Sequence, residues 1–417
     1  MTTTRVGSSS SSTAAALQAR TVRLFLALTP LYYTLIAYGV VPTTIRRWPR
    51  AALSFAPLRS TLMWAVLLHA AVAASMWRVY TASLVVLEDG AGRPIIVSYS
   101  TFPALLAIAH VAGCGLLLPI WWEAPRYKEL LALARTLVGC LDDDDGVLSV
   151  DWPRRRTVIV SWIWSLALVL ACPGVVIFWQ FRLTEYGGEA IRVPAHWISN
   201  VLIAAIVSSL CLVYHIIRDV AEALAQRFAQ EAGRAPPLSC VELLQYRRAW
   251  LTLRDMLQGA MFAPVSVTLC CTHLVVNNVL CMYHVLNSIL GGAPPQLTLG
   301  VTFSTSQITL LLVVMCLAAD GAVDAVAKFA RSFESLEPNS ANNFAFAREV
   351  FREALSHSPS PVCVGGFWYL NRRTVLSMCL MILTYLIVLV EFRQQDSCPH
   401  GGNATRLGAG GGDGDDA

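Results

Sequence analysis

Near its C-terminal end the chain reads T-Y-L-I-V-L-V-E-F over Thr384–Phe392, so that an apolar run ends on a carboxylate. Residues spaced i, i+4, i+7 and i+11 share one face of a helix, and here that face presents Thr384, Val388, Glu391 and Gln395. If several copies of this helix surrounded one axis, their carboxylates would form an acidic ring. Such rings select cations in channels.

Other roles for the same residues stay open. Glu391 could be an interfacial carboxylate that reaches the lipid headgroups and pairs with Arg393. Phe392 could belong to the aromatic belt found at membrane interfaces. Thr384 and Tyr385 could serve ordinary packing and hydrogen bonding between membrane helices.

Composition indicates a membrane protein that crosses the bilayer several times. Hydrophobic residues make up 55% of the 417 residues and charged residues 14%, against about 25% charged in soluble domains. Eight apolar segments approach the ~20 residues that a spanning helix needs. The first, at 22–41, contains Pro30 and Gly39 and is expected to lie flush with the membrane. The other seven are predicted spans, near 60–84, 99–122, 157–180, 196–217, 261–290, 299–319 and 374–392.

The long uncharged run at 256–319 counts as two of these spans because G-G-A-P-P at 291–295 is a turn signal. Of the 31 lysines and arginines, 25 fall on one side of the resulting arrangement and 6 on the other. The basic side faces the cytoplasm, which places the N-terminus inside and the C-terminus outside. The sequon at Asn403 then lies outside, as a candidate for glycosylation. The basic connections 218–255 and 320–373 carry apolar residues at helical spacing and are predicted to extend the spans into the cytoplasm.

Three functional classes find little support. The chain contains no phosphate-binding loop, no H-E-x-x-H and no G-x-S-x-G, and its eight histidines lack partners at metal-ligand spacing. An enzyme, a metal site and a cofactor are therefore not expected. No predicted span has an acid at its middle, as coupled transporters do. A G-protein-coupled receptor would have its N-terminus outside, and the chain has no Asn-Pro dipeptide.

The signature of the last span resembles that of the arthropod gustatory receptor family, which has T-Y, five hydrophobic residues and then Q-F. Thr384, Tyr385 and Phe392 match, and Glu391 stands where the family has glutamine. The approach to this span is also similar, with G-F at 366–367, L-N-R at 370–372 and V-L at 375–376. The N-terminal P-L-Y at 30–32 resembles the family's membrane-flush segment.

The resemblance implies an all-α membrane protein with seven transmembrane helices, a membrane-flush N-terminal helix and a cytoplasmic helical anchor domain. It implies a tastant-gated, non-selective cation channel in the plasma membrane, built as a homo- or heterotetramer with other gustatory receptor subunits. The seventh helix would line the pore, with Val388 and Phe392 able to close it. The implied regions are 1–59 (N-terminus), 60–260 (spans one to four), 261–373 (spans five and six with the anchor), 374–395 (pore helix) and 396–417 (outer tail). The alternative is a non-channel receptor or scaffold subunit that needs a co-receptor.

The ligand is expected in the outer half of spans one to six, and no nucleic-acid partner is expected. Aromatic and polar residues there could orient a small tastant; they are Tyr99, Trp179, Gln180, His196, Trp197, Asn200, Thr302, Ser306 and Gln307. The sugar-receptor branch of the family has T-Y-E at the signature, whereas position 386 is leucine here. This argues against that branch and leaves bitter, fructose-like and other tastants open.

Overall fold

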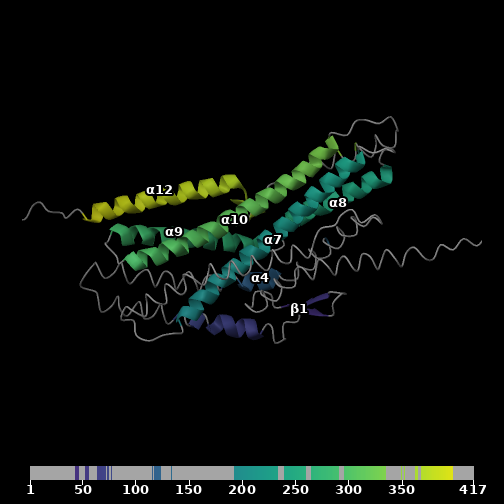
Figure 1. The fold of residues 1–417 in the computed structure, drawn as a ribbon. Helices are drawn as coiled ribbons and strands as arrows, with labels where there is room; N and C mark the ends of the chain where they lie inside the picture. Colours follow the sequence, from purple (N-terminus) through teal and green to yellow (C-terminus); the bar gives the residue numbers. More distant parts are fainter. Residues whose placement is uncertain are drawn as a thin grey trace, which may run out of the picture.

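The computed structural model describes part of the chain, drawn as ribbon in Figure 1. The described residues are 43–46, 52–55, 63–71, 73–74, 77, 115, 117–123, 133, 192–232, 239–259, 264–290, 295–334, 349, 352, 362–364 and 368–397. The predicted segments at 22–41 and 157–180 lie outside these residues, as does the tail beyond Ser397. The first two predicted spans lie within them only in part.

Helices dominate the described residues. The long ones are α7 (Arg192–Ala232), α8 (Cys240–Gly259), α9 (Pro264–Leu290), α10 (Pro295–Glu334) and α12 (Arg372–Ser397), and α4 (Leu117–Glu123) is short. Two small antiparallel pairs accompany them: β1 (Thr43–Arg46) with β2 (Ala52–Phe55), and β3 (Cys363–Val364) with β4 (Trp368–Tyr369). The all-α prediction omitted these strands, because such short pairs leave no run of alternating residues to detect.

The predicted spans four to seven fall on α7, α9, α10 and α12, in that order. The break at G-G-A-P-P is confirmed, since α9 ends at Leu290 and α10 begins at Pro295. Among the described helices, two stretches are long and apolar enough to cross a bilayer: Val265–Tyr283 in α9 and Thr305–Phe333 in α10. The second runs past the predicted end at 319, because apolar residues recur between the charged ones as far as Phe333.

Two helices are far longer than a membrane requires. α7 has 41 residues and α10 has 40, and at 1.5 Å per residue each is about 60 Å long. The hydrocarbon core of a bilayer is about 30 Å thick. The part of α7 after the predicted span, from residue 218 onward, buries Val220, Leu224 and Phe228. The apolar spacing in this charged segment therefore predicted correctly that the helix continues and packs on its neighbours.

α8 packs against α7 and α10, where aromatic rings close the interface. Phe228 of α7, Tyr246 of α8, and Phe329 and Phe333 of α10 are all buried, and this set is the aromatic cluster. The centroids of Phe228 and Phe333 are 3.9 Å apart, and those of Phe228 and Tyr246 5.2 Å. The Tyr246 hydroxyl donates to Glu231 Oε2 at 2.6 Å, and Arg227 bonds the other oxygen of that carboxylate at 2.6 Å.

The start of α8 is a capping box, S-x-x-E at 239–242. The backbone N–H and the hydroxyl of Ser239 donate to Glu242 Oε2 at 2.7 and 2.8 Å, and the Glu242 N–H donates back to Ser239 Oγ at 3.3 Å. These bonds to the carboxylate lower the pKa of Glu242. The helix start is therefore specified by local sequence.

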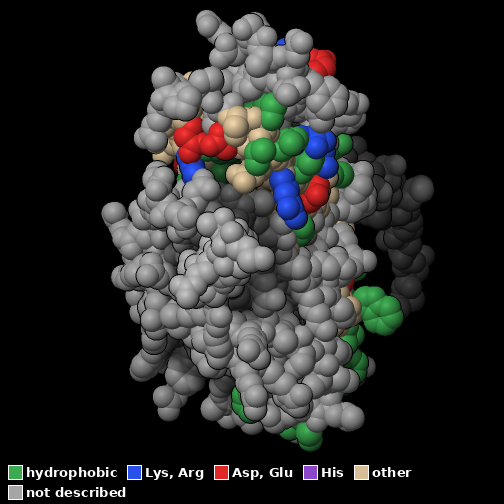
Figure 2. All heavy atoms as spheres, turned by 90° about the vertical axis from the view of Figure 1, so that its right-hand side faces the viewer, with side chains coloured by type: hydrophobic (Ala, Val, Ile, Leu, Met, Phe, Trp, Pro, Cys, Tyr) green, Lys and Arg blue, Asp and Glu red, His purple; other side chains and the backbone are tan. Residues whose placement is uncertain are grey.

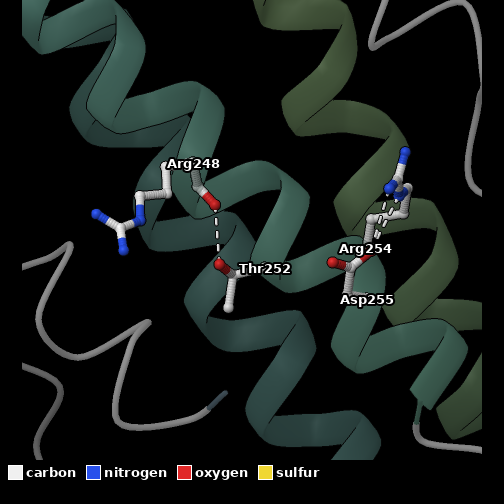
Figure 3. Close-up of polar contacts among 4 residues, drawn as sticks. All are labelled: Arg248, Thr252, Arg254 and Asp255. Atoms are coloured by element: carbon white, nitrogen blue, oxygen red, sulfur yellow. Dashed lines mark hydrogen bonds and ion pairs between the residues drawn. The ribbon is translucent and has the colours of Figure 1, made fainter. Parts of the chain in front are cut away.

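Figure 3 shows the polar contacts farther along α8. The Thr252 hydroxyl donates to the Arg248 carbonyl at 2.9 Å, and Arg254 pairs with Asp255 at 3.1 Å. The Arg254 guanidinium also lies 5.5 Å from the centre of the buried Trp250 ring, within cation–π range. Viewed end-on, the described side chains in the upper part of Figure 2 mix apolar, acidic and basic groups.

We expect Tyr246→Phe to destabilise the packing of α8 on α7 while leaving the ring in place. The hydroxyl makes a hydrogen bond to a carboxylate, a kind worth about 1.5–3 kcal/mol, and Glu231 would keep only its bond to Arg227. Thermal unfolding of the purified protein in detergent should show a lower midpoint. Thr252→Val, which removes a hydroxyl bonded only to its own helix, should change the midpoint much less.

Candidate functional site

The helix that carries the T-Y-L-I-V-L-V-E-F stretch is α12, and its start is held by the β3–β4 hairpin. The Leu370 N–H donates to the Val362 carbonyl at 2.9 Å, which closes the hairpin just before the helix. The Asn371 side chain then accepts from the Thr374 N–H at 2.8 Å, as an N-cap does. The Thr374 hydroxyl also donates to the Tyr369 carbonyl. The L-N-R motif is therefore a helix start.

α12 packs on α9 and α10 along a narrow stripe (Figure 1). Met378 and Ile382 are buried, and Val375 and Leu386 are half-buried. These residues follow i, i+3, i+7 and i+11 spacing, which is one face of a helix. Most other described side chains of α12 are exposed, including the large apolar residues Leu376, Leu380, Met381, Leu383 and Ile387.

The predicted pore face lies on the far side of α12 from this contact stripe. Thr384, Val388 and Glu391 are exposed, and at 100° per residue they lie about 200° around the helix from the contact stripe. The Thr384 hydroxyl donates to the Leu380 carbonyl of the same helix at 2.9 Å. Phe392 and Gln395 belong to α12, as does Tyr385, but their side chains lie outside the described residues.

The N-terminal end of α12 is tied to α10 by an ion pair. Arg372 Nε lies 2.8 Å from Asp320 Oδ2, and another nitrogen of the same guanidinium lies 3.9 Å from Asp324 Oδ2. Asp320 follows the predicted sixth span directly, and Arg372 precedes the predicted seventh. The contact joins the end of one predicted span to the start of the next.

The structure does not gather the predicted ligand residues into one described site. Thr302 and Ser306 are exposed on one face of α10, where the Ser306 hydroxyl donates to the Thr302 carbonyl at 2.8 Å. Gln307 is buried on a different face of that helix. His196, Trp197 and Asn200 lie in the first turns of α7, with side chains outside the described residues. Tyr99, Trp179, Gln180 and Asn403 lie outside the described residues altogether.

The residue that sequence reasoning missed is Glu123. Its carboxylate, 3% exposed at the end of α4, accepts from the N–H groups of Val265 and Ser266 at 3.0 and 3.1 Å, and from the Ser266 hydroxyl at 2.6 Å. These contacts cap the start of α9 across more than 140 residues of sequence. We call this contact the Glu123 cap. One signal was present: no Ser, Thr, Asp or Asn lies between Gly259 and Pro264, so α9 has no cap of its own.

Some polar side chains buried in the apolar helices bond to polar neighbours. His273 and Asn277 of α9 are buried and lie 2.9 Å apart. The Asn278 amide donates to Thr309 Oγ1 of α10 at 2.9 Å. In the part of the chain that the structure describes, no group of three or more His, Cys, Asp and Glu could hold a metal ion. The Asn278–Thr309 bond joins two helices, as polar side chains commonly do in membrane bundles.

Comparison with known proteins defines the class. A family model described as 7tm Chemosensory receptor matches residues 28–396. The chain belongs to this family of seven-transmembrane chemosensory receptors, as the T-Y-L-I-V-L-V-E-F signature predicted. It is thus a multi-pass membrane receptor by family.

Individual proteins are similar over most of the chain. The gustatory and odorant receptor 24 of Anopheles gambiae is 21% identical over 382 residues, which cover 90% of this chain and 79% of that protein. The insect olfactory receptor OR5 from Machilis hrabei matches with a TM-score of 0.59 at 10% identity, over 89% of this chain and 99% of OR5. The OR5 complex with eugenol matches with a TM-score of 0.50 at 12% identity, over 88% and 98%. These likenesses show a shared fold.

Proposed function

We propose that this protein is a gustatory receptor that acts as a tastant-gated, non-selective cation channel in the plasma membrane. Four subunits, identical or mixed with other gustatory receptors, surround one pore lined by α12. The observation that carries this proposal is the arrangement of α12: one narrow stripe holds it to its own chain, and the stripe with Thr384, Val388 and Glu391 faces away. A carboxylate such as that of Glu391, turned away from the bundle, needs a polar environment, and a water-filled pore supplies one.

Two contacts support the proposed path of the chain through the membrane. The Glu123 cap brings the end of the predicted second span to the start of the fifth. The Arg372–Asp320 pair brings the end of the sixth to the start of the seventh. The proposed seven-span path puts all four of these ends on one side of the membrane, as both contacts require, and that side is the cytoplasmic one when the N-terminus is inside. The proposed glycosylation at Asn403 follows from the same topology.

The proposed ligand is a small tastant, bound among the outer residues named above and surrounded by membrane lipid. OR5, which shares the fold, has been solved in complex with eugenol. Eugenol is therefore a sensible first probe, beside panels of bitter compounds and sugars. Among the candidates whose side chains are described, Thr302 and Ser306 are exposed and Gln307 is buried, so the first two are the ones open to such a molecule.

The proposal predicts a ligand-evoked current. Cells that express the receptor, alone and with other gustatory receptor subunits, should pass an inward cation current when eugenol or a member of the tastant panel is applied under voltage clamp. Replacement of external Na⁺ by a large organic cation should abolish that current. Receptor at the cell surface that passes no current with any partner subunit or tastant would favour the non-channel scaffold instead.

A further inference from the structure

One face of α12 combines a cationic side chain with a strip of exposed apolar side chains. Its residues follow i, i+3, i+7, i+10 and i+14 spacing; they are Arg373, Leu376, Leu380, Leu383 and Ile387. We call this the arginine–leucine face. The four apolar side chains are 51–64% exposed, and the face lies about 130° around the helix from the contact stripe. The contacts of α12 with its own chain therefore leave this face uncovered.

Arg373 is exposed and has no ion-pair or hydrogen-bond partner among the described residues, whereas its neighbour Arg372 is paired with Asp320. Arg373 directly precedes the predicted seventh span, where lipid headgroups would begin on the proposed path of the chain. Tyr369, 47% exposed in β4, is of a residue type enriched at this level. An arginine at such a boundary extends its charged head among the headgroups while its stem rests on apolar surface.

The apolar part of the face has the length of one lipid leaflet. At 1.5 Å per residue, Leu376 lies about 4.5 Å along the helix axis from Arg373, and Leu383 about 15 Å. The hydrocarbon core of a bilayer is about 30 Å thick, so one leaflet contributes about 15 Å. A charged group at one end and a leaflet's length of apolar surface beyond it are the two halves of a phospholipid's own shape.

Charge favours a lipid over a second copy of the helix as the occupant of this face. α12 contains no acidic residue before Glu391, so a neighbouring α12 at the same depth would offer Arg373 no carboxylate. A phosphate group can accept two parallel N–H bonds from one guanidinium. The cytoplasmic leaflet also carries the anionic lipids of the membrane, and Arg373 lies on that side when the N-terminus is inside.

We propose that the arginine–leucine face binds one anionic glycerophospholipid, such as phosphatidylserine. Arg373 binds the phosphate, and an acyl chain lies along Leu376, Leu380 and Leu383. The assignment to the cytoplasmic leaflet rests on the proposed topology. The site itself requires neither a tastant nor an open pore.

Photo-crosslinking tests this site in full-length receptor reconstituted in phosphatidylcholine nanodiscs. A small fraction of lipid carries a photoactivatable acyl chain and either a phosphatidylserine or a phosphatidylcholine headgroup, and mass spectrometry identifies the crosslinked peptides. We expect residues 376–383 to capture the phosphatidylserine probe several-fold better than the phosphatidylcholine probe. Arg373→Gln should reduce capture of the phosphatidylserine probe about fivefold, the effect of one basic residue at an anionic membrane surface. Arg373→Lys should retain most of the capture.

Arg331→Gln is the matched control. Arg331 is also exposed, but it lies on α10 about 18 Å beyond the predicted end of the sixth span. The substitution removes the same charge at a distance from the leaflet. The preference for phosphatidylserine at residues 376–383 should therefore stay at the wild-type value.

Equal capture of the two probes by the wild type, or a preference that survives Arg373→Gln, would overturn the proposal. Capture of neither probe at residues 376–383 would mean that protein covers the face, which overturns it as well. If Arg373→Gln does not yield folded protein, the salt dependence of the wild type replaces it: the preference should fall as salt screens the charge, and a constant preference counts against the site. If phosphatidylserine is captured as expected but no tastant evokes current, the channel function fails while the lipid site stands.

Discussion

Replacing Glu123 with alanine should prevent the receptor from reaching a stable folded state. The carboxylate is the acceptor for two backbone N–H groups and one hydroxyl at the start of α9, in a place where the Glu123 side chain itself is 3% exposed. Alanine has no side-chain acceptor, so it cannot replace the carboxylate in these three hydrogen bonds. The expected result is loss of most surface expression and of the single symmetric peak in size-exclusion chromatography.

The loss of folding stability can be estimated from the donors that lose their acceptor. A buried donor without an acceptor costs about 1–3 kcal/mol, and bonds to charged groups lie at the upper end. Two buried donors of Ser266 and the part-buried N–H of Val265 lose their partner at once, against a total stability of about 5–15 kcal/mol for a typical folded protein. The carboxylate also faces the positive end of the α9 dipole, a favourable interaction that alanine removes as well.

Two matched variants show whether the effect comes from the lost carboxylate or from any substitution in this region. Glu123→Gln keeps one oxygen acceptor and should retain part of the folded protein. Trp122→Ala alters the adjacent residue, which is 86% exposed, and should leave expression close to wild type. Normal expression and melting of Glu123→Ala would mean that α9 is capped in another way and would contradict the geometry described here.

Glu391→Lys should reduce cation current by more than tenfold in the proposed channel. Four carboxylates around one mouth would become four ammonium groups. One unit charge about 10 Å from a permeating ion contributes roughly 1.7 kcal/mol at an effective dielectric constant of about 20, and reversal changes its sign in every subunit. A tenfold loss needs only about 1.4 kcal/mol of added barrier.

Glu391→Gln, which only removes the charge, and Asp255→Lys, a charge reversal on another helix, serve as controls. Glu391→Gln restores the residue of the family signature and should keep current while lowering the preference for divalent over monovalent cations. Asp255→Lys reverses another partly exposed acid, on α8, and should leave selectivity unchanged. Reversal potentials in mixed Ca²⁺ and Na⁺ solutions provide the measurement. If Glu391→Gln and Glu391→Lys both conduct like the wild type, Glu391 does not face the pore.

Helix positions were predictable because they depend on local composition. The uncharged run at 256–319 and the G-G-A-P-P break specify α9 and α10 without knowledge of their partners. The apolar spacing through Val220, Leu224 and Phe228 likewise specifies the extension of α7. Orientation of the chain and the role of residues 1–59 and 60–260 as separate regions remain predictions.

The contacts between distant segments were not predictable in the same way. Glu123 and Ser266 are 143 residues apart. The absence of a local cap before α9 indicates that its first N–H groups need an acceptor, but the sequence does not identify that acceptor. The same holds for Arg372 and Asp320, two of many charges at predicted helix ends.

Electron cryomicroscopy of the full-length receptor in lipid nanodiscs will show whether four copies of α12 line one pore. We expect four subunits around one axis, with α12 nearest that axis and Thr384, Val388 and Glu391 directed toward it. A monomer, a different helix on the axis, or α12 with Glu391 turned toward lipid would contradict it.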